Sequence, residues 1–129
     1  MSRPLLLLEK SPGKSPSRAL VEPESLADEV QRLLGAARVD WLPWGPGLVV
    51  AVDEDAQERG RRRNVTLGHV DRDGRQGQPL EVWGPMLVCG FDGSNLVGLQ
   101  LEELDDVSQL LLLGEDSPRL VLWPSSEIH

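Results

Sequence analysis

Residues 81–99 constrain the fold more than any other stretch of the chain. The apolar run that begins at Leu80 continues to Phe91, stops at Asp92-Gly93, and is followed by a second extended segment from Asn95 to Leu99. A short apolar run bounded by turn residues is typical of a buried strand, and Asp-Gly between two such runs is a strong hairpin signal. The stretch therefore predicts a buried strand, a tight turn at Asp92-Gly93 and a second strand.

Further strands are predicted where apolar residues lie between turn-forming clusters. Gly45-Pro46-Gly47 separates two apolar segments and predicts another hairpin. Residues 11–18 carry two prolines and predict an exposed loop. The strands predicted outside 81–99 are Leu5–Leu8, Ala19–Val21, Val39–Trp44, Leu48–Val52, a weak edge strand over Val65–Val70 and a last strand over Arg119–Trp123, with a charged loop over 53–64 and a turn over Asp71–Gly74.

Two helices are predicted from apolar residues at helical spacing. In the first, over 26–34, Ser25 is in position to cap the N-terminus and Gly35 to end the helix. The second covers 101–113, begins with acidic residues that suit the positive end of the helix dipole, and is expected to end at Gly114. The chain is therefore predicted to be an α+β protein with a mainly antiparallel sheet of about five to seven strands and two short helices. Residues 1–124 are expected to form a single domain and 125–129 a loose tail.

Composition limits the partners and the compartment. The 129 residues carry a net charge of −8, which disfavours binding to nucleic acid or to an anionic membrane and is compatible with a basic protein partner. Cys89 is the only cysteine, so no intrachain disulfide forms, and its apolar neighbours predict a buried, inert thiol. Pro4–Leu8 is too short for the apolar core of a signal peptide, and we expect a cytoplasmic protein.

Candidate chemistry is sparse. Cys89 and His69 are a possible nucleophile and base, although a cysteine in an apolar strand usually behaves as a small buried hydrophobe. Asp71-Arg72-Asp73-Gly74 lacks the ligand spacing of a calcium loop and fits a plain turn. No glycine-rich phosphate loop is present, and we predict no catalytic residue, no metal and no cofactor.

Three groups of residues are candidates for a protein interface. Arginines near residue 60 either bind phosphate or an acidic partner, or form a solvated loop balanced by the acidic residues at 53–58. Trp44, beside a Gly-Pro-Gly turn, is the tryptophan expected to be exposed as an anchor. Acidic residues at the start of the second helix either dock on a basic surface or only keep the protein soluble. The candidates are Trp44, Arg61, Arg62, Arg63, Asn64, Glu102, Glu103, Asp105 and Asp106.

The order of several motifs resembles a family of small uncharacterised domains carried largely by phages, plasmids and conjugative elements of bacteria. The matching motifs, over about residues 5–107, are the Pro12–Pro16 turn, the helix that ends at Gly35, Leu48–Val52 followed by acidic residues, Asn64, Gly84–Gly90 and Leu99–Glu102. The chain departs from the family pattern at Asp53, Arg62 and Gln100, where the family has Asn, Pro and Thr. The resemblance implies a mobile-element origin and a fold, but no activity.

These observations predict a binding protein rather than an enzyme. The leading hypothesis is a small acidic accessory or antagonist protein of a phage or mobile element, which docks on a host or phage protein, such as a defence or nucleic-acid-handling machine. The alternative is a module that binds or sequesters a small ligand, with the loops 53–64 and 72–79 as the rim of its pocket. An uncharacterised enzyme is the third hypothesis.

Overall fold

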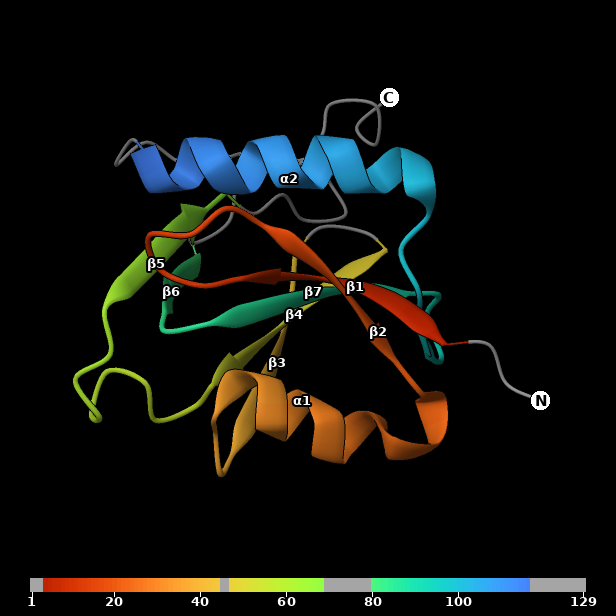
Figure 1. The fold of residues 1–129 in the computed structure, drawn as a ribbon, viewed down its shortest axis with the longest axis horizontal. Coiled ribbons are helices and arrows are strands. Elements are labelled where there is room, and N and C mark those ends of the chain that lie inside the picture. The colour runs from red at the N-terminus through yellow and green to blue at the C-terminus, as the bar shows by residue number, and fades with distance from the viewer. Residues whose placement is uncertain (1–3, 45–46, 69–79, 117–129) are drawn as a thin grey trace.

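The computed structural model describes residues 4–44, 47–68 and 80–116 (Figure 1). It confirms an α+β fold with a mainly antiparallel sheet. The elements, in chain order, are β1 (Leu5–Lys10), β2 (Ser17–Val21), the 3₁₀ turn η1 (Pro23–Ser25), α1 (Leu26–Leu34), β3 (Val39–Pro43), β4 (Leu48–Asp53), β5 (Arg63–Leu67), β6 (Leu80–Trp83), β7 (Met86–Phe91), β8 (Leu96–Val97) and α2 (Leu101–Asp116).

The larger sheet has six strands in the order β2-β1-β7-β4-β3, and β8 pairs with one end of β7. Every pairing is antiparallel, and β7 is central, with β1 on one side and β4 on the other. The hairpin signals at β3–β4 and at β7–β8 are therefore confirmed. Strands β5 and β6 pair only with each other among the described residues and form a second, two-stranded sheet.

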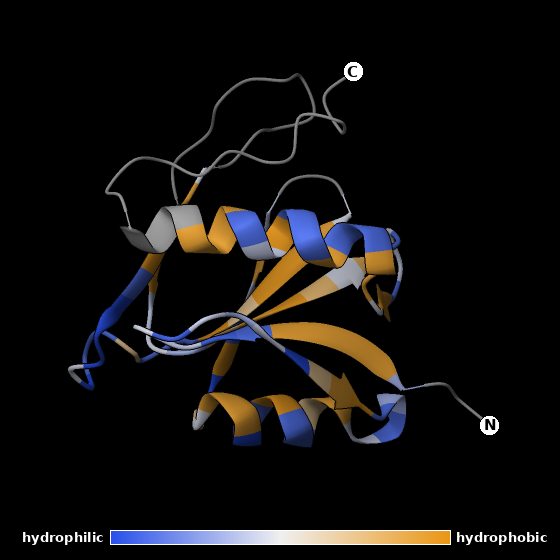
Figure 2. Ribbon diagram, turned by 45° about the horizontal axis from the view of Figure 1, so that its top comes forward, coloured by the Kyte–Doolittle hydropathy of each residue, from blue (hydrophilic) through white to orange (hydrophobic). Residues whose placement is uncertain are grey.

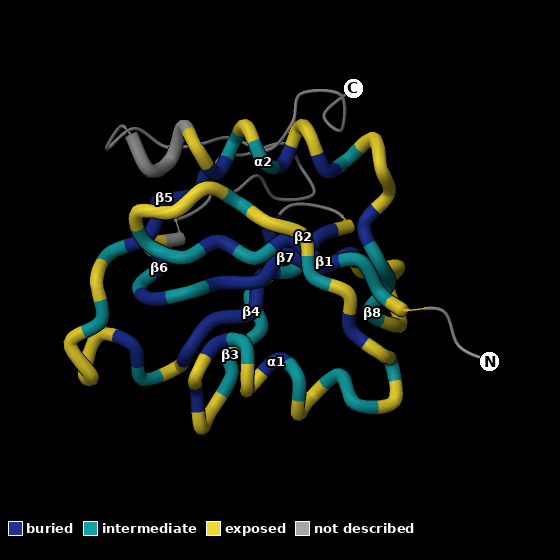
Figure 3. Tube along the Cα trace, in the orientation of Figure 1, coloured by how far each residue is buried: buried dark blue, intermediate teal, exposed yellow. Residues whose placement is uncertain are grey.

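The larger sheet lies between α1 on one side and α2 with the β5–β6 sheet on the other (Figures 1 and 2). Side chains of β7 alternate between the two layers: Met86 and Val88 join the α2 side, whereas Leu87 and Cys89 join the α1 side. All five residues from Met86 to Gly90 are buried, as the dark central strands in Figure 3 show. Burial on both faces explains why this strand is a continuous apolar run rather than an alternating one.

Several local predictions are corrected by the structure. The apolar run from Leu80 is not one strand, because Gly84 adopts a φ of +74° and divides it into β6 and β7, which belong to different sheets. Gly35 ends α1 in the left-handed conformation as predicted, but the Ser25 side chain makes no capping hydrogen bond, since η1 leads directly into the helix. Gly114 lies within α2, which continues to Asp116.

Other predictions fall outside the described residues. These are the extension of the 65–70 strand beyond Leu67 to Val70, the turn at Asp71–Gly74, the last strand over Arg119–Trp123 and the tail 125–129. The described helices include none that is long and apolar enough to cross a membrane.

Candidate functional site

The arginine-rich loop is anchored by a buried carboxylate at the end of β4. The side chain of Asp53 is fully buried, and its Oδ2 lies 2.7 Å from Nη1 of Arg59 and 3.0 Å from Nε of Arg61. Its Oδ1 accepts a hydrogen bond from the backbone N–H of Asp55 at 3.0 Å. Both guanidinium groups also donate to the carbonyl oxygen of Gly35, at 3.0 and 2.8 Å, where α1 ends. Two cations thus neutralise one buried anion and bind the negative end of a helix.

Two other candidates of this segment, Asn64 and Arg63, also make contacts within the fold. Asn64 is buried, and its Nδ2 donates to the carbonyl oxygens of Lys10 and Gly84 at 2.7 and 2.9 Å. Its Oδ1 accepts from Nζ of the buried Lys10 at 3.2 Å, so Asn64 joins β1 to the corner between β6 and β7. Arg63 donates to Oγ1 of Thr66 at 2.5 Å. Arg62 is the exposed member of the group.

The prediction that Trp44 is exposed is wrong. Its side chain is 0% exposed, belongs to the core on the α2 side, and donates from Nε1 to the carbonyl oxygen of Gly68 at 2.8 Å. The backbone N–H of Trp44 donates to the carbonyl of Leu48 at 3.1 Å, which extends the contact between β3 and β4 to Trp44. A large apolar ring with a satisfied N–H is stable in the interior, and in this conformation Trp44 cannot anchor a partner.

The acidic residues of α2 mostly face solvent, as expected. Glu102, Asp105 and Asp106 are exposed, while Glu103 is half-buried and its Oε1 accepts from the backbone N–H of Gln100 at 2.8 Å. Glu103 therefore satisfies one of the free donors at the start of the helix. The other three carboxylates remain available to solvent or to a partner.

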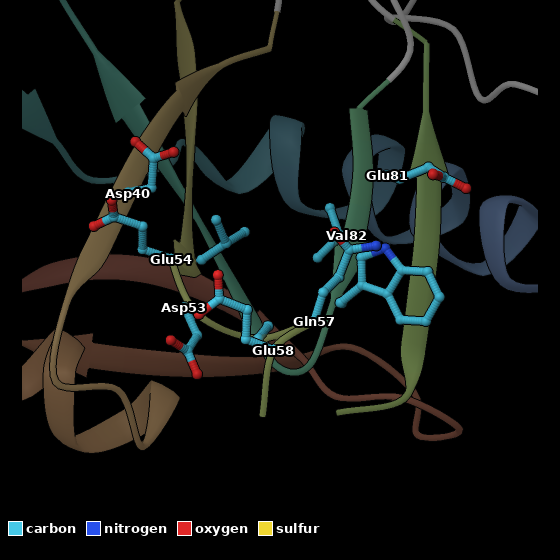
Figure 4. A pocket seen from close by; sticks show the side chains of 10 residues that line it. Asp40, Asp53, Glu54, Gln57, Glu58, Glu81 and Val82 are labelled. Atoms are coloured by element: carbon cyan, nitrogen blue, oxygen red, sulfur yellow. The ribbon is translucent and has the colours of Figure 1, made fainter. Parts of the chain in front are cut away.

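A concave site among the described residues lies between the end of the β3–β4 hairpin and β6 (Figure 4). It is an open pocket of about 210 Å³. Val52, Ala56 and Val82, all buried, supply apolar surface, and Trp83 supplies an aromatic ring. The remaining lining residues are polar or acidic: Asp40, Asp53, Glu54, Gln57, Glu58 and Glu81.

The carboxylates of this acidic pocket differ in how far the protein neutralises them. Asp53 is paired with two arginines, and Glu54 is 3.9 Å from Nε of Arg38. Asp40, Glu58 and Glu81 are exposed and make no ion pair or hydrogen bond with the described part of the chain. These three residues come from β3, from the loop after β4 and from β6, so folding places charges of one sign around a single hollow.

Arg38 lies beside this pocket and forms an ion pair with Asp55. Its Nη2 and Nε lie 2.6 and 3.2 Å from the two carboxylate oxygens of Asp55. This hydrogen-bonded pairing holds the pKa of Asp55 below its ordinary value of 3.8. The same pairing is the largest cause that raises the pKa of Arg38. Arg38 is therefore held mainly by Asp55, while its Nε lies 3.9 Å from Glu54 and its charge also attracts Glu58 more weakly.

Sequence reasoning found part of this pocket and missed its far wall. The loop 53–64 was predicted to form a pocket rim, and its first half, from Asp53 to Glu58, does line the pocket. The other predicted rim, 72–79, lies outside the described residues. The sequence did not indicate that the pocket is also lined by Asp40, Glu81 and Trp83. A single acidic or aromatic residue within a strand does not predict a pocket. These residues line one pocket only because the β5–β6 sheet lies beside the edge of the larger sheet.

The geometry offers little for nucleophilic or metal chemistry. Cys89 is buried as predicted, its thiol donates to the carbonyl of Val97 at 3.2 Å, and desolvation raises the pKa of Cys89 to about 11. Within the described ranges, no three His, Cys, Asp or Glu side chains are grouped so as to hold a metal ion. His69 is not among the described residues.

Comparison with known proteins does not assign the chain. No family model matches it, and neither a curated protein nor a solved structure shows significant similarity to it. The resemblance to a mobile-element family therefore stays a prediction, and the functional argument rests on the acidic pocket itself.

Proposed function

We propose that this protein is a binding module that docks on a basic protein partner and accepts an arginine or lysine side chain of that partner in the acidic pocket. The observation that carries the proposal is that one hollow is lined by Asp40, Glu58 and Glu81, three exposed carboxylates with no ion pair among the described residues. Unbalanced charge of one sign in a concave site attracts and orients a ligand of the opposite sign.

The walls of the pocket fit the rest of such a side chain. Val52, at 9% the most exposed of the three apolar lining residues, offers a small apolar contact to the methylene stem of an arginine or lysine. Trp83 offers a ring face, and tryptophan is the aromatic residue that binds cations best. Its Nε1 is buried and has no hydrogen-bond partner in the described structure, so the ring and not this donor would meet the ligand.

The size of the pocket favours a side chain over a larger free ligand. Pockets for drug-sized molecules usually measure about 300–1,000 Å³, and this one is about 210 Å³ and open on one side. The alternative hypothesis, a module that binds a small ligand, is kept for one class of ligand. That class is a small amine, because the carboxylates of the pocket would bind its positive charge.

The biological role extends the prediction from the sequence. A small protein with a net charge of −8 that binds cationic side chains is suited to cover a basic surface on a protein that handles nucleic acid. An accessory or antagonist role for a phage or mobile element rests on the family resemblance alone, and the binding chemistry does not depend on it.

The decisive experiment compares two triple variants that change the charge equally. The first neutralises the pocket with Asp40→Asn, Glu58→Gln and Glu81→Gln, and the second neutralises α2 with Glu102→Gln, Asp105→Asn and Asp106→Asn. The probe is a short arginine peptide, with a citrulline peptide as its uncharged isostere, and binding is followed by calorimetry and by chemical shifts of backbone amides.

We expect the arginine peptide to shift amides around the pocket, and the pocket variant to weaken its binding at least about tenfold, since three charge contacts of about 0.5 kcal/mol each are lost. The α2 variant should bind nearly as well as the wild type. Equal losses in both variants would contradict the pocket and indicate non-specific attraction. A loss in the α2 variant alone would make the acidic helix the working face. Equal binding of the citrulline peptide would contradict charge recognition.

A further inference from the structure

Strand β2 forms one edge of the larger sheet, and no other described strand pairs with its outer side. It pairs with β1 on one side, and it is the last strand in the order β2-β1-β7-β4-β3. An open edge presents a row of backbone N–H and C=O groups to which another strand can bind. Pro16 and Pro23 bracket this edge, so residues 17–22 are the segment available for pairing.

The side chains of this edge are unusual for a strand exposed to solvent. Leu20 is 69% exposed, although it lies opposite the partly buried Leu6 of β1. Arg18 and Glu22, two positions to either side of Leu20, are exposed and have no ion pair among the described residues. Glu22 has φ −71° and ψ 132°, so the extended backbone continues through it. Arg18 and Leu20 therefore point to the same face of the strand, and Glu22 follows in the extended backbone after it.

We propose that two copies of this chain associate by pairing their β2 strands antiparallel about a twofold axis at Leu20. In this register Leu20 lies opposite Leu20 of the second copy, and Arg18 of each copy lies opposite Glu22 of the other. Ala19 lies opposite Val21 on the other face. In this register each residue lies opposite one whose backbone N–H and C=O groups point to the same side of β2. Opposed residues therefore either both face the second copy or both face β1, as an antiparallel ladder requires.

Charge complementarity identifies the occupant of this edge as a second copy. A self-pairing interface must match the same surface to itself, and here one strand carries a cation and an anion at equal distances from an apolar centre. Neighbouring registers lose the match. A shift of two residues one way places Arg18 opposite Leu20, and a shift the other way places Glu22 opposite Leu20. Opposite charges across a strand pair stabilise it, and an apolar pair excludes water between them.

The contact predicts a weak dimer. A ribbon of about five residues on each side buries much less than the roughly 1,200 Å² at which stable interfaces begin. Dimerisation should therefore depend on protein concentration, and it would leave the acidic pocket free, because β3 lies at the opposite edge of the sheet.

Charge reversal gives a test that does not depend on a loss of folding. Arg18→Glu and Glu22→Arg each place like charges opposite one another, and each should weaken dimerisation at least about tenfold in sedimentation velocity, since two attractions become two repulsions. The two variants mixed should form a heterodimer, because all cross-strand pairs are again of opposite sign. The double variant Arg18→Glu/Glu22→Arg should dimerise like the wild type.

Cross-linking tests the register. Leu20→Cys should be joined efficiently to a second copy by a short bis-maleimide, while Glu102→Cys on α2 should not; the native Cys89 is buried and does not compete. The proposal is overturned if the wild type stays monomeric to about 1 mM, if the mixed variants remain monomeric, or if the two cysteine variants cross-link equally.

Discussion

The arginine loop and the acidic pocket adjoin one another and share Asp53, yet the protein treats their charges in opposite ways. In the arginine loop, the guanidinium groups of Arg59 and Arg61 bind the buried Asp53 and the carbonyl of Gly35. In the pocket, the carboxylates of Asp40, Glu58 and Glu81 have no such partner among the described residues. The two cations take part in folding, whereas these three anions stay unpaired in the described part of the chain.

This difference shows that charge content along a chain is a poor guide to its interfaces. The arginine cluster is the more conspicuous feature of the sequence, and two of its members act within the fold. The carboxylates of the pocket are scattered over 42 positions of the chain, from Asp40 to Glu81 inclusive, and only folding gathers them. A functional charge is better recognised by its lack of an internal partner than by clustering in sequence.

The largest expected effect comes from the shared residue. Asp53→Ala leaves two guanidinium groups without their anion and removes the acceptor for the N–H of Asp55, so we expect a loss of about 3 kcal/mol in the free energy of unfolding. Urea denaturation measures it. The matched change Asp40→Ala, at an exposed pocket carboxylate, should cost less than about 0.5 kcal/mol. Similar losses in both variants would remove the contrast between the two regions.

A pair of glycine variants tests how tightly the arginine loop is packed. A Cβ at Gly84 would lie 2.6 Å from Cδ of Arg61, whereas a Cβ at Gly60 would meet nothing within 4 Å; both residues have positive φ, +74° and +72°. Gly60→Ala should cost about 1 kcal/mol for its backbone conformation alone. Gly84→Ala should cost about 1–3 kcal/mol more, because Arg61 must move. If thermal denaturation gave the same loss of stability for both variants, the side chain of Arg61 would move aside at little cost and would not be held in place.

Neutralising the pocket should hardly change stability. The triple variant Asp40→Asn, Glu58→Gln and Glu81→Gln removes only exposed carboxylates, and we expect the free energy of unfolding to change by less than about 0.5 kcal/mol for each substitution, towards greater stability if mutual repulsion is relieved. Urea denaturation at low ionic strength is the measurement. A clear destabilisation would show that these carboxylates, like Asp53, are part of the fold.

The smallest effect concerns the pair at the rim. The pKa of Asp55 is lowered by the hydrogen-bonded Arg38, so this pair stabilises the folded state above the ordinary value of 3.8 and ceases to do so as the pH falls through the lowered value. Arg38→Gln should therefore be less stable than the wild type near neutral pH, and the gap should close in acid. Arg62→Gln, at an arginine without an ion pair among the described residues, is the control and should show no gap that depends on pH.

Much of the architecture followed from local pattern. Helix α1 has its predicted bounds, and the β3–β4 and β7–β8 hairpins form where the turn residues indicate. Cys89 is buried where its apolar neighbours placed it. The errors occurred where a distant contact overrides local preference: Trp44 is drawn into the core by packing and by the carbonyl of Gly68, and Gly84 breaks the apolar run because the chain there passes from one sheet to the other.

The sequence by itself determined the elements, the α+β class and the acidic character, because these depend on residues close together in the chain and on their sum. Tertiary structure alone decided which charges are free. Asn64 and Arg61 connect distant parts of the fold because their partners, Lys10 and Asp53, are supplied by other strands. Asp40 and Glu81 line one pocket because β6 lies beside the end of the β3–β4 hairpin. Pairing of charges depends on distances in space, and those distances exist only after the two sheets have packed.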